Sequence, residues 1–338
     1  MPFPIEEKLV IGVASSALFD LSESHQVYLD RGPDEYRAYQ ERQRDVVLAR
    51  GVAFPFIRRF LSINKCFPQQ APVEVVLFSR NSPETGLRVM RSIAHYGLDI
   101  SRAAFMTGKS PYPYLPAFNA ALFLSANEED VKSAIDVDYP AGLVLPSRIA
   151  DEEDDIELRV AFDFDGVLAD DESEAVFKRD GLGQFHAHET LHMARPHQPG
   201  PLAGMFRKLA MLQQLEKQAE RDDPDYRRIV RIAIITARSA PAHERVVTTL
   251  GSWGVSPDET FFLGGMDKSR VLSVFKPHIF FDDQLTHLTS GPGGTIPMVH
   301  VPFGVANRSA AEAVSVSVSV SGMPTGAATP SSDPAPAA

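Results

Sequence analysis

Four short apolar runs in the second half of the chain each end at polar side chains, a pattern that predicts buried parallel strands. In chain order, the polar groups are two carboxylates, a hydroxyl, an amine and two more carboxylates. Because ligands of parallel sheets bind beyond the carboxyl ends of the strands, we expect these groups to meet in one crevice. The runs are residues 160–162 before Asp163 and Asp165, 232–235 before Thr236, 261–263 before Lys268, and 279–281 before Asp282 and Asp283.

Each of these motifs also has an ordinary structural interpretation. The segment 163–166 could be a plain strand-to-turn junction, since Asp and Gly are favoured in turns. The other three could be capped junctions between a strand and the helix-like segment that follows it. Two carboxylates at a strand end are, however, suited to binding a metal and attacking an electrophile. The fixed order of the four motifs therefore favours a catalytic site over four unrelated junctions.

With their neighbours, these motifs resemble those of the haloacid dehalogenase-like superfamily of phosphotransferases, and within it the cytosolic 5′-nucleotidase type I family. The resemblance covers most of residues 8–304, although Phe164 and Gly166 depart from the Gly and Ala that we expect there in the family. It implies a doubly wound, Rossmann-like parallel α/β sheet with a small helical cap. The segments that carry it are 162–174 (FDFDGVLADDESE), 234–239 (IITARS), 252–254 (SWG) and 277–284 (PHIFFDDQ), with 17–20, 95–96, 106–108 and 124–126 upstream.

The resemblance also implies an activity, the hydrolysis of nucleoside 5′-monophosphates, with AMP-like or IMP-like purines as the first guess. Asp163 would attack phosphorus to form an aspartyl-phosphate. Asp165 would protonate the leaving oxygen and then activate water. Mg²⁺ prefers hard oxygen ligands, and its expected ligands are Asp163, Asp165, Asp282 and Asp283. The expected substrate-binding residues are Thr236, Ala237, Arg238, Lys268, His188 and His192.

Length, charge and cysteine content limit the classes of binding partner that we expect. The length of 338 residues allows about two domains. A net charge of −11 argues against a nucleic acid polymer, which needs a basic surface, whereas a mononucleotide needs only a local cluster of donors. The single cysteine, Cys66, excludes an internal disulfide and a cysteine metal site. Neither a long apolar run nor a signal pattern occurs, so we expect a cytoplasmic protein without a membrane partner, and homo-oligomerisation is left open.

Two other functions stay open from the sequence. The first is a phosphatase acting on another small phosphate ester, such as a sugar phosphate. The second is a non-catalytic protein that senses nucleotides. A pure binding protein has no use for the second carboxylate of the first motif, Asp165, which argues against the latter.

The first half of the chain looks like a degenerate second copy of the same α/β unit. Residues 76–127 align with 234–284 when one gap is allowed, and 9–19 read like 158–168. Any two βαβ units could share such a pattern, which is the alternative. If the copy is real, residues 8 to about 150 should fold as a second doubly wound sheet, separate from the catalytic one, with the same strand order and no metal. N-terminal strands that extend the catalytic sheet, or that follow another order, would refute the duplication. The alignment puts Ala14, Ser16, Phe78, Pro111 and Ser125 at the catalytic positions.

The predicted domains are therefore 1–150, a catalytically degenerate α/β domain, and 151–306, the catalytic domain with a cap insert at about 171–230. Residues 307–338 form an Ala/Ser/Pro-rich tail that we expect to be disordered. In the cap insert, the spacing of His186, His188 and His192 does not match a zinc site, and a polar cap surface is the expectation.

Overall fold

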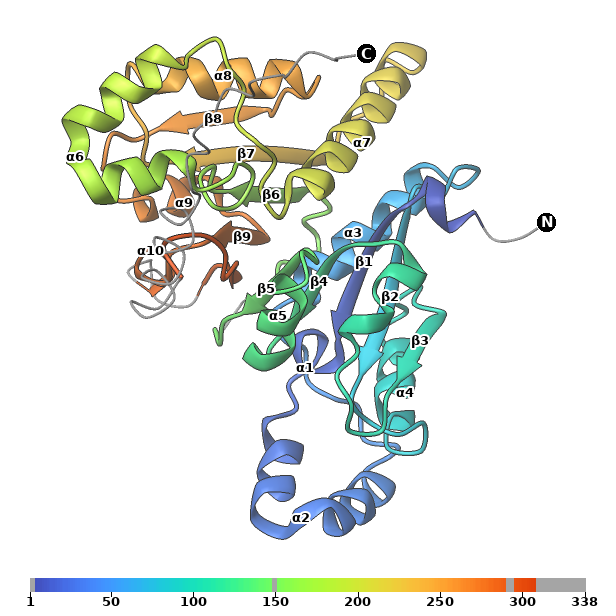
Figure 1. Ribbon diagram of the computed structural model, residues 1–338. Helices are drawn as coiled ribbons and strands as arrows, with labels where there is room; N and C mark the ends of the chain where they lie inside the picture. Colours follow the sequence, from blue (N-terminus) through green and yellow to red (C-terminus); the bar gives the residue numbers. More distant parts are fainter. Residues whose placement is uncertain (1–3, 148–150, 290–294, 308–338) are drawn as a thin grey trace, which may run out of the picture.

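A single ten-stranded β-sheet organises the part of the chain that this computed structural model describes, residues 4–147, 151–289 and 295–307 (Figure 1). The predicted tail and its Val/Ser alternation lie outside the described residues. The strands are β1 (Leu9–Ala14), β2 (Val73–Ser79), β3 (Arg102–Phe105), β4 (Ala120–Ser125), β5 (Ala141–Val144), β6 (Leu158–Phe162), β7 (Val230–Thr236), β8 (Glu259–Phe262), β9 (Ile279–Asp282) and β10 (Met298–His300).

Helices connect successive strands and cover the sheet, as in other α/β proteins. They are α1 (Ser15–Leu18), α2 (Ser22–Arg42), α3 (Phe54–Cys66), α4 (Leu87–His95), α5 (Glu128–Ile135), α6 (Glu172–Leu191), α7 (Ala203–Asp222), α8 (His243–Ser252), α9 (Ser269–Phe275) and α10 (Leu285–Thr289). The predicted strands of the four motifs are β6, β7, β8 and β9. The prediction of a Rossmann-like α/β fold with a mostly parallel sheet is confirmed.

The sheet consists of two halves with the same strand order. Across the sheet the strands run β3-β2-β1-β4-β5-β10-β9-β6-β7-β8, so β1 and β6 hold the same place in their halves. All pairs within a half are parallel, whereas β5 and β10 pair antiparallel. The expectation of two separate sheets is therefore wrong: the edge strands β5 and β10 use their free backbone groups to pair with each other. Of the two outcomes stated as refuting the duplication, the extension of the catalytic sheet occurs and the difference in strand order does not.

The strand registers of the two halves also agree. Each residue in β2 to β5 has a counterpart in the second half whose number is 157 higher. For example, Val76 pairs with Arg102, and their counterparts Ala233 and Glu259 pair with each other. At the junction of the two halves, Leu143 of β5 pairs with its own counterpart, His300 of β10. The register corrects one predicted equivalence, because it is Ser79 and not Phe78 that stands where Thr236 stands.

The antiparallel junction also sets where the two crevices lie. Since strands on either side of it run in opposite directions, the carboxyl ends of β1 to β5 and those of β6 to β10 point to opposite edges of the sheet. Each half therefore presents its own switch point at its own edge, which is the place where α/β sheets bind ligands.

The hydrophobic core continues across the predicted domain boundary at residue 150. One buried cluster continues across both halves and includes Ile11 and Phe60 as well as Phe162 and Phe206. Helix α3 contacts β6, and α7 contacts β1 and β4. On the other face the cores are separate, one in each half. The halves thus share one side of their core.

The predicted cap at about 171–230 is only partly a covering element. Helix α6 is bent at Gly181, whose φ of 78° is accessible to glycine. Helix α7 instead packs on the sheet and buries Met205, Phe206 and Leu209. Its apolar stripe explains this, since a helix with such a face must bury it. No helix among the described residues is both long and apolar enough to cross a membrane.

Gly142 tests the junction of the two halves. A β-carbon on Gly142 of β5 would collide with the side chain of Val299 in β10. We expect Gly142→Ala to destabilise the protein by about 1–3 kcal/mol through overpacking. Gly183→Ala is the matched control, because Gly183 lies in α6 with open space around it and alanine favours helix there. Urea unfolding measures both. A Gly142→Ala protein as stable as Gly183→Ala would contradict the close packing of β5 on β10.

Candidate active site

Lys268 joins two carboxylates at the carboxyl ends of β6 and β9. Its Nζ lies 2.8 Å from Asp163 and 2.7 Å from Asp282. All three side chains are almost completely buried. Asp163 directly follows β6 and Asp282 ends β9, and these strands are neighbours in the sheet, so the fold brings the first, third and fourth motifs together.

Burial and charge shift the protonation equilibria of this group. Burial, together with the carboxylates of Asp282 and Asp165, raises the pKa of Asp163 to about 7 against the pull of Lys268. Burial alone would lower the pKa of Lys268, but Asp163 and Asp282 outweigh it and raise that pKa. Lys268 is therefore a permanent positive charge at the site, and it lowers the pKa of Asp282 despite the burial of that carboxyl.

Asp283 is a buried carboxylate with no partner among the described residues. Both of its oxygens lack a hydrogen bond, and the side chain is fully buried. Burial and the nearby carboxylates of Asp163 and Glu174 raise its pKa to about 10. Glu174 is a second crowded carboxylate here, since one of its oxygens is also buried and unpartnered. Buried charge without a partner is costly, so this orphaned group fits a bound cation. Oxygen ligands at this density suit Mg²⁺.

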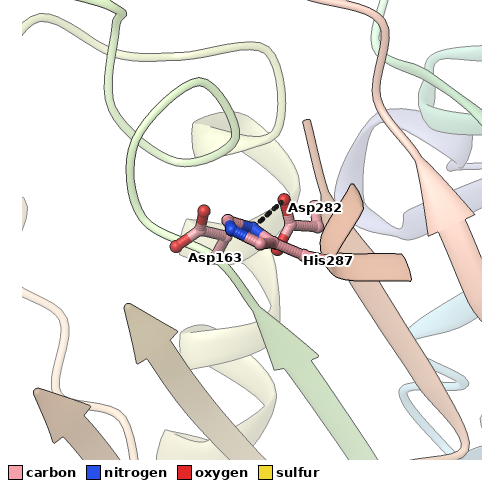
Figure 2. A group of neighbouring side chains, drawn as sticks. All are labelled: Asp163, Asp282 and His287. Carbon is pink, nitrogen blue, oxygen red and sulfur yellow. Dashed lines mark hydrogen bonds and ion pairs between the residues drawn. The ribbon is translucent and has the colours of Figure 1, made fainter. Parts of the chain in front are cut away.

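His287 adds a nitrogen to the same place, as Figure 2 shows. Its Nδ1 lies 3.1 Å from an oxygen of Asp282, and Asp163, Asp282 and His287 together could hold a metal ion. The sequence analysis missed His287, which lies in α10, one turn beyond the acidic pair. It also gave no role to Glu174, which the quoted motif contains.

Asp165 is held by Arg238 rather than left free in the crevice. The guanidinium of Arg238 binds both carboxylate oxygens of Asp165, at 2.8 and 2.6 Å. Arg238 is itself buried and also donates to Glu189 of α6 and stacks over the ring of Phe164. Burial would lower the pKa of Arg238, but Asp165 and Glu189 raise it. Arg238 was predicted to contact substrate, and its geometry makes it a support of Asp165.

Glu189 is the centre of a wider buried network. It accepts hydrogen bonds from Ser173 (2.6 Å) and Arg245 (3.0 Å) as well as from Arg238. Hydrogen bonding to His197, the charge of Arg238 and the hydroxyl of Ser173 lower the pKa of Glu189 far below its usual range in spite of its burial. The network links α6 and α8 to the loop after β7, so α6 is anchored directly to the group that holds Asp165.

The remaining predicted residues lie at different depths. Thr236 is buried at the end of β7, and its hydroxyl accepts a hydrogen bond from the backbone of Arg238. Ala237 is exposed. The rings of His188 in α6 and His192 just after it lie 4.3 Å apart at an angle of 46°, and Nδ1 of His188 lies 3.3 Å from Glu189. These two histidines are therefore tied to the network of α6.

A second group that could hold a metal consists of Asp170, Glu172 and His197. Arg245 pairs with Glu172 at 2.8 Å, and Arg238 contacts His197 at 3.2 Å. Since arginines already balance this charge, the group differs from Asp283, which has no such partner.

Comparison with known proteins agrees with this geometry. The sequence profile of the 5′-nucleotidase family matches residues 1–308. Among curated proteins, the cytosolic 5′-nucleotidase 1B of Homo sapiens is 35% identical over 295 residues, which are 85% of this chain and 48% of that protein. The chain thus spans about half the length of this relative. No solved structure matches the chain.

The orphaned carboxylate yields a prediction for metal binding. The raised pKa of Asp283 means that this carboxyl must take up a proton when the metal-free protein folds at neutral pH, which costs stability. Asp283→Asn removes this cost, so we expect the metal-free variant to be more stable than the wild type. Its affinity for Mg²⁺ should fall by about tenfold or more, since a ligand is lost. Thermal unfolding with EDTA and with increasing Mg²⁺ measures both effects. Asp225→Asn, at an exposed position, should change neither. An Asp283→Asn protein that Mg²⁺ stabilises as strongly as the wild type would remove Asp283 from the metal site.

Proposed function

The chain belongs to the 5′-nucleotidase family, and we propose that it is a Mg²⁺-dependent phosphoric monoester hydrolase that converts nucleoside 5′-monophosphates to nucleosides and phosphate. The observation that carries the proposal is the buried group of Asp163, Lys268 and Asp282 beside the unpartnered Asp283. AMP-like or IMP-like purines are the first substrates to test. A cytoplasmic location is proposed from the printed name of the human relative.

Charge neutralisation is the first demand of the reaction, because the phosphorus of a monoester is shielded by negative oxygens. Lys268 lies deep in the site and supplies a fixed positive charge. The hydroxyl of Thr236 and the backbone amides after β7 offer further donors for phosphoryl oxygens. Asp163, Asp282 and Asp283, with the backbone carbonyl of Asp165, would hold the Mg²⁺, which when bound neutralises charge on the phosphoryl group.

Asp163 is the proposed nucleophile. It directly follows β6, and a hydrogen bond of 2.7 Å from the backbone amide of Phe164 fixes its carboxylate. The attack forms a bond from the Asp163 oxygen to phosphorus and breaks the bond to the 5′-oxygen, which gives an aspartyl-phosphate on this chain. Lys268 favours the ionised form of Asp163 that attack requires, against the burial and the neighbouring carboxylates that raise the pKa of Asp163.

Asp165 is the proposed acid and base. It would give a proton to the departing 5′-oxygen and then take one from the water that hydrolyses the aspartyl-phosphate. The residue after Asp165 is Gly166, which has a φ of 69°, and a β-carbon on Gly166 would come within 2.6 Å of Asp283. The ion pair with Arg238 orients Asp165, but it must loosen for Asp165 to carry a proton. Movement of α6, which holds Arg238 through Glu189, would loosen it.

The two alternatives are retained from the sequence. A phosphatase for another small ester, such as a sugar phosphate, would use the same residues, and only the substrate screen separates the two. A non-catalytic nucleotide sensor would need neither the nucleophile nor the acid.

We further propose that the chain is a duplicated haloacid dehalogenase-like unit whose first copy is degenerate. Besides the strand order and the register, side-chain contacts recur. Ser92 accepts a hydrogen bond from the amide of Leu48 at 3.0 Å, and its counterpart Thr249 accepts one from His197 at 3.0 Å. Arg88 donates to the carbonyl of Val46, as Arg245 does to that of Arg195. Any two βαβ units share an alternation of strands and helices, but they need not share such contacts.

A phosphate-release screen over nucleoside monophosphates and sugar phosphates with Mg²⁺ tests the activity. We expect Asp163→Asn to lower kcat to less than about one hundredth, a change of about 2.7 kcal/mol in the barrier. Acid quenching with ³²P-labelled substrate should trap labelled protein in the wild type and not in the variant. Near-normal turnover or unchanged labelling of Asp163→Asn would show that another residue attacks phosphorus.

The role of Arg238 is tested by Arg238→Lys. Lysine keeps the charge but cannot bind both oxygens of Asp165. If Arg238 positions Asp165, kcat should fall by about tenfold or more while KM changes little. Arg207→Lys, whose arginine lies over the ring of Trp253 away from the site, serves as the control. A large rise in KM with unchanged kcat would instead mean that Arg238 contacts the substrate.

A further inference from the structure

The first half of the chain contains a large cavity at the counterpart of the catalytic crevice. It has a volume of about 810 Å³, within the usual range for small-molecule sites. Its lining includes residues at the carboxyl ends of β1, β2 and β4, among them Ser15, Ser79 and Ser125. These strands surround the switch point of this half, where the geometry of an α/β sheet places ligands. All residues that line the cavity come from 14–151.

The positions in this cavity that correspond to the charged residues of the catalytic crevice are uncharged. None of the six counterparts of the charged catalytic and supporting residues is itself charged. Without carboxylates at these positions the cavity lacks the counterpart of the Mg²⁺ site, and without the lysine it lacks the counterpart of the unshared positive charge for a phosphoryl group. The pairs are Asp163 with Ala14, Asp165 with Ser16, Arg238 with Asn81, Lys268 with Pro111, Asp282 with Ser125, and Asp283 with Ala126.

The supporting network has become neutral in the same way. Glu189 and Arg238 form an ion pair in the second half. In the first half, the phenol of Tyr36 donates to Asn81 at 2.6 Å and accepts from Gln40 at 3.0 Å. Such a network keeps its geometry without needing any charged ligand to balance it.

The arginines that line the cavity already have acidic partners. Arg80 binds both oxygens of Asp130, at 3.0 and 2.6 Å. Arg50 pairs with Glu153 at 2.5 Å. A phosphate dianion would have to displace these carboxylates, so the cavity favours an uncharged ligand.

Hydroxyls and aromatic rings remain as the recognition groups. Ser15 and Ser79 are buried and lie 3.1 Å apart, and the buried hydroxyl of Ser147 has no partner among the described residues. On the wall, Tyr28 of α2 is 47% exposed and contacts the ring of Tyr36 edge-on. Hydroxyl groups suit a ribose, and an exposed aromatic ring suits a planar base.

We propose that this cavity is a second, metal-free ligand site that binds an uncharged nucleoside. The site is separate from the catalytic crevice, because the two open at opposite edges of the sheet. The ribose hydroxyls would bind the serines of the lining, and the base would stack on Tyr28. A ligand here would influence catalysis only through the shared sheet and core.

Equilibrium dialysis of the full chain with radiolabelled adenosine and inosine, in EDTA, tests the proposal. Ser16 lines the cavity and is exposed, so the larger side chain of Ser16→Phe would occupy part of the cavity without displacing core residues. We expect Ser16→Phe and Tyr28→Ala each to lower nucleoside affinity by about tenfold or more. Tyr114→Ala is the matched control, since Tyr114 is 52% exposed and lies outside the cavity, and it should stay within about twofold of the wild type.

Two further readouts separate the possible failures. Initial rates of phosphate release without added nucleoside should be unchanged in Ser16→Phe and Tyr28→Ala, which shows that both variants fold. Normal nucleoside binding by both variants, or no binding by the wild type, overturns the proposal. Metal-free binding of inorganic phosphate that Ser16→Phe abolishes would overturn the assignment of an uncharged ligand. A chain without hydrolase activity would refute the proposed function alone, since the dialysis does not depend on it.

Discussion

The ion pairs of Lys268 with Asp163 and Asp282 are the interaction on which the catalytic end of the sheet depends. Carboxylates this close repel one another in a medium that screens charge poorly. The lysine compensates only because β6 and β9 are adjacent and parallel, which brings the two carboxylates within reach of one ammonium group. The stacked rings of Phe162 and Phe281, 5.1 Å apart, support that spacing from below. Substituting Lys268 alone would leave buried carboxylates without compensation.

The same electrostatic argument explains why the first half has no lysine at the position that corresponds to Lys268. Once the carboxylates are absent, nothing requires a lysine, and Pro111 stands in its place. The buried network around Asn81 likewise needs no counter-charge. The two halves therefore share one backbone arrangement but differ in the side chains that they place at the catalytic positions and their counterparts. The catalytic positions are charged in the second half, and their counterparts in the first half are uncharged.

Local features of the fold could be predicted from the sequence. The strands before Asp163, Thr236, Lys268 and Asp282 follow from short apolar runs, because burial on both faces of a parallel sheet leaves a local signature. The positions of these polar residues at the strand ends could be predicted for the same reason. The pairing of β5 with β10 could not be predicted, since β10 has only three residues and its partner lies far away in the chain. Similarly, the contact of Glu189 with Arg238 depends on how α6 bends at Gly181. The single-residue error at Ser79 arose because a gap in an alignment has no fixed place without hydrogen-bond registers.

The contact of Leu143 with His300 has the form found on the axis of a symmetric dimer, where a residue meets its own copy. In a homodimer both subunits are encoded by one sequence, so any substitution enters both sites at once. Loss of the nucleophile would then inactivate the whole assembly. A single chain that carries both units removes this coupling, because each position can change independently of its counterpart. The antiparallel junction thus has the packing of a twofold pair, and under the proposed duplication the covalent link would allow one site to lose chemistry that the other retains.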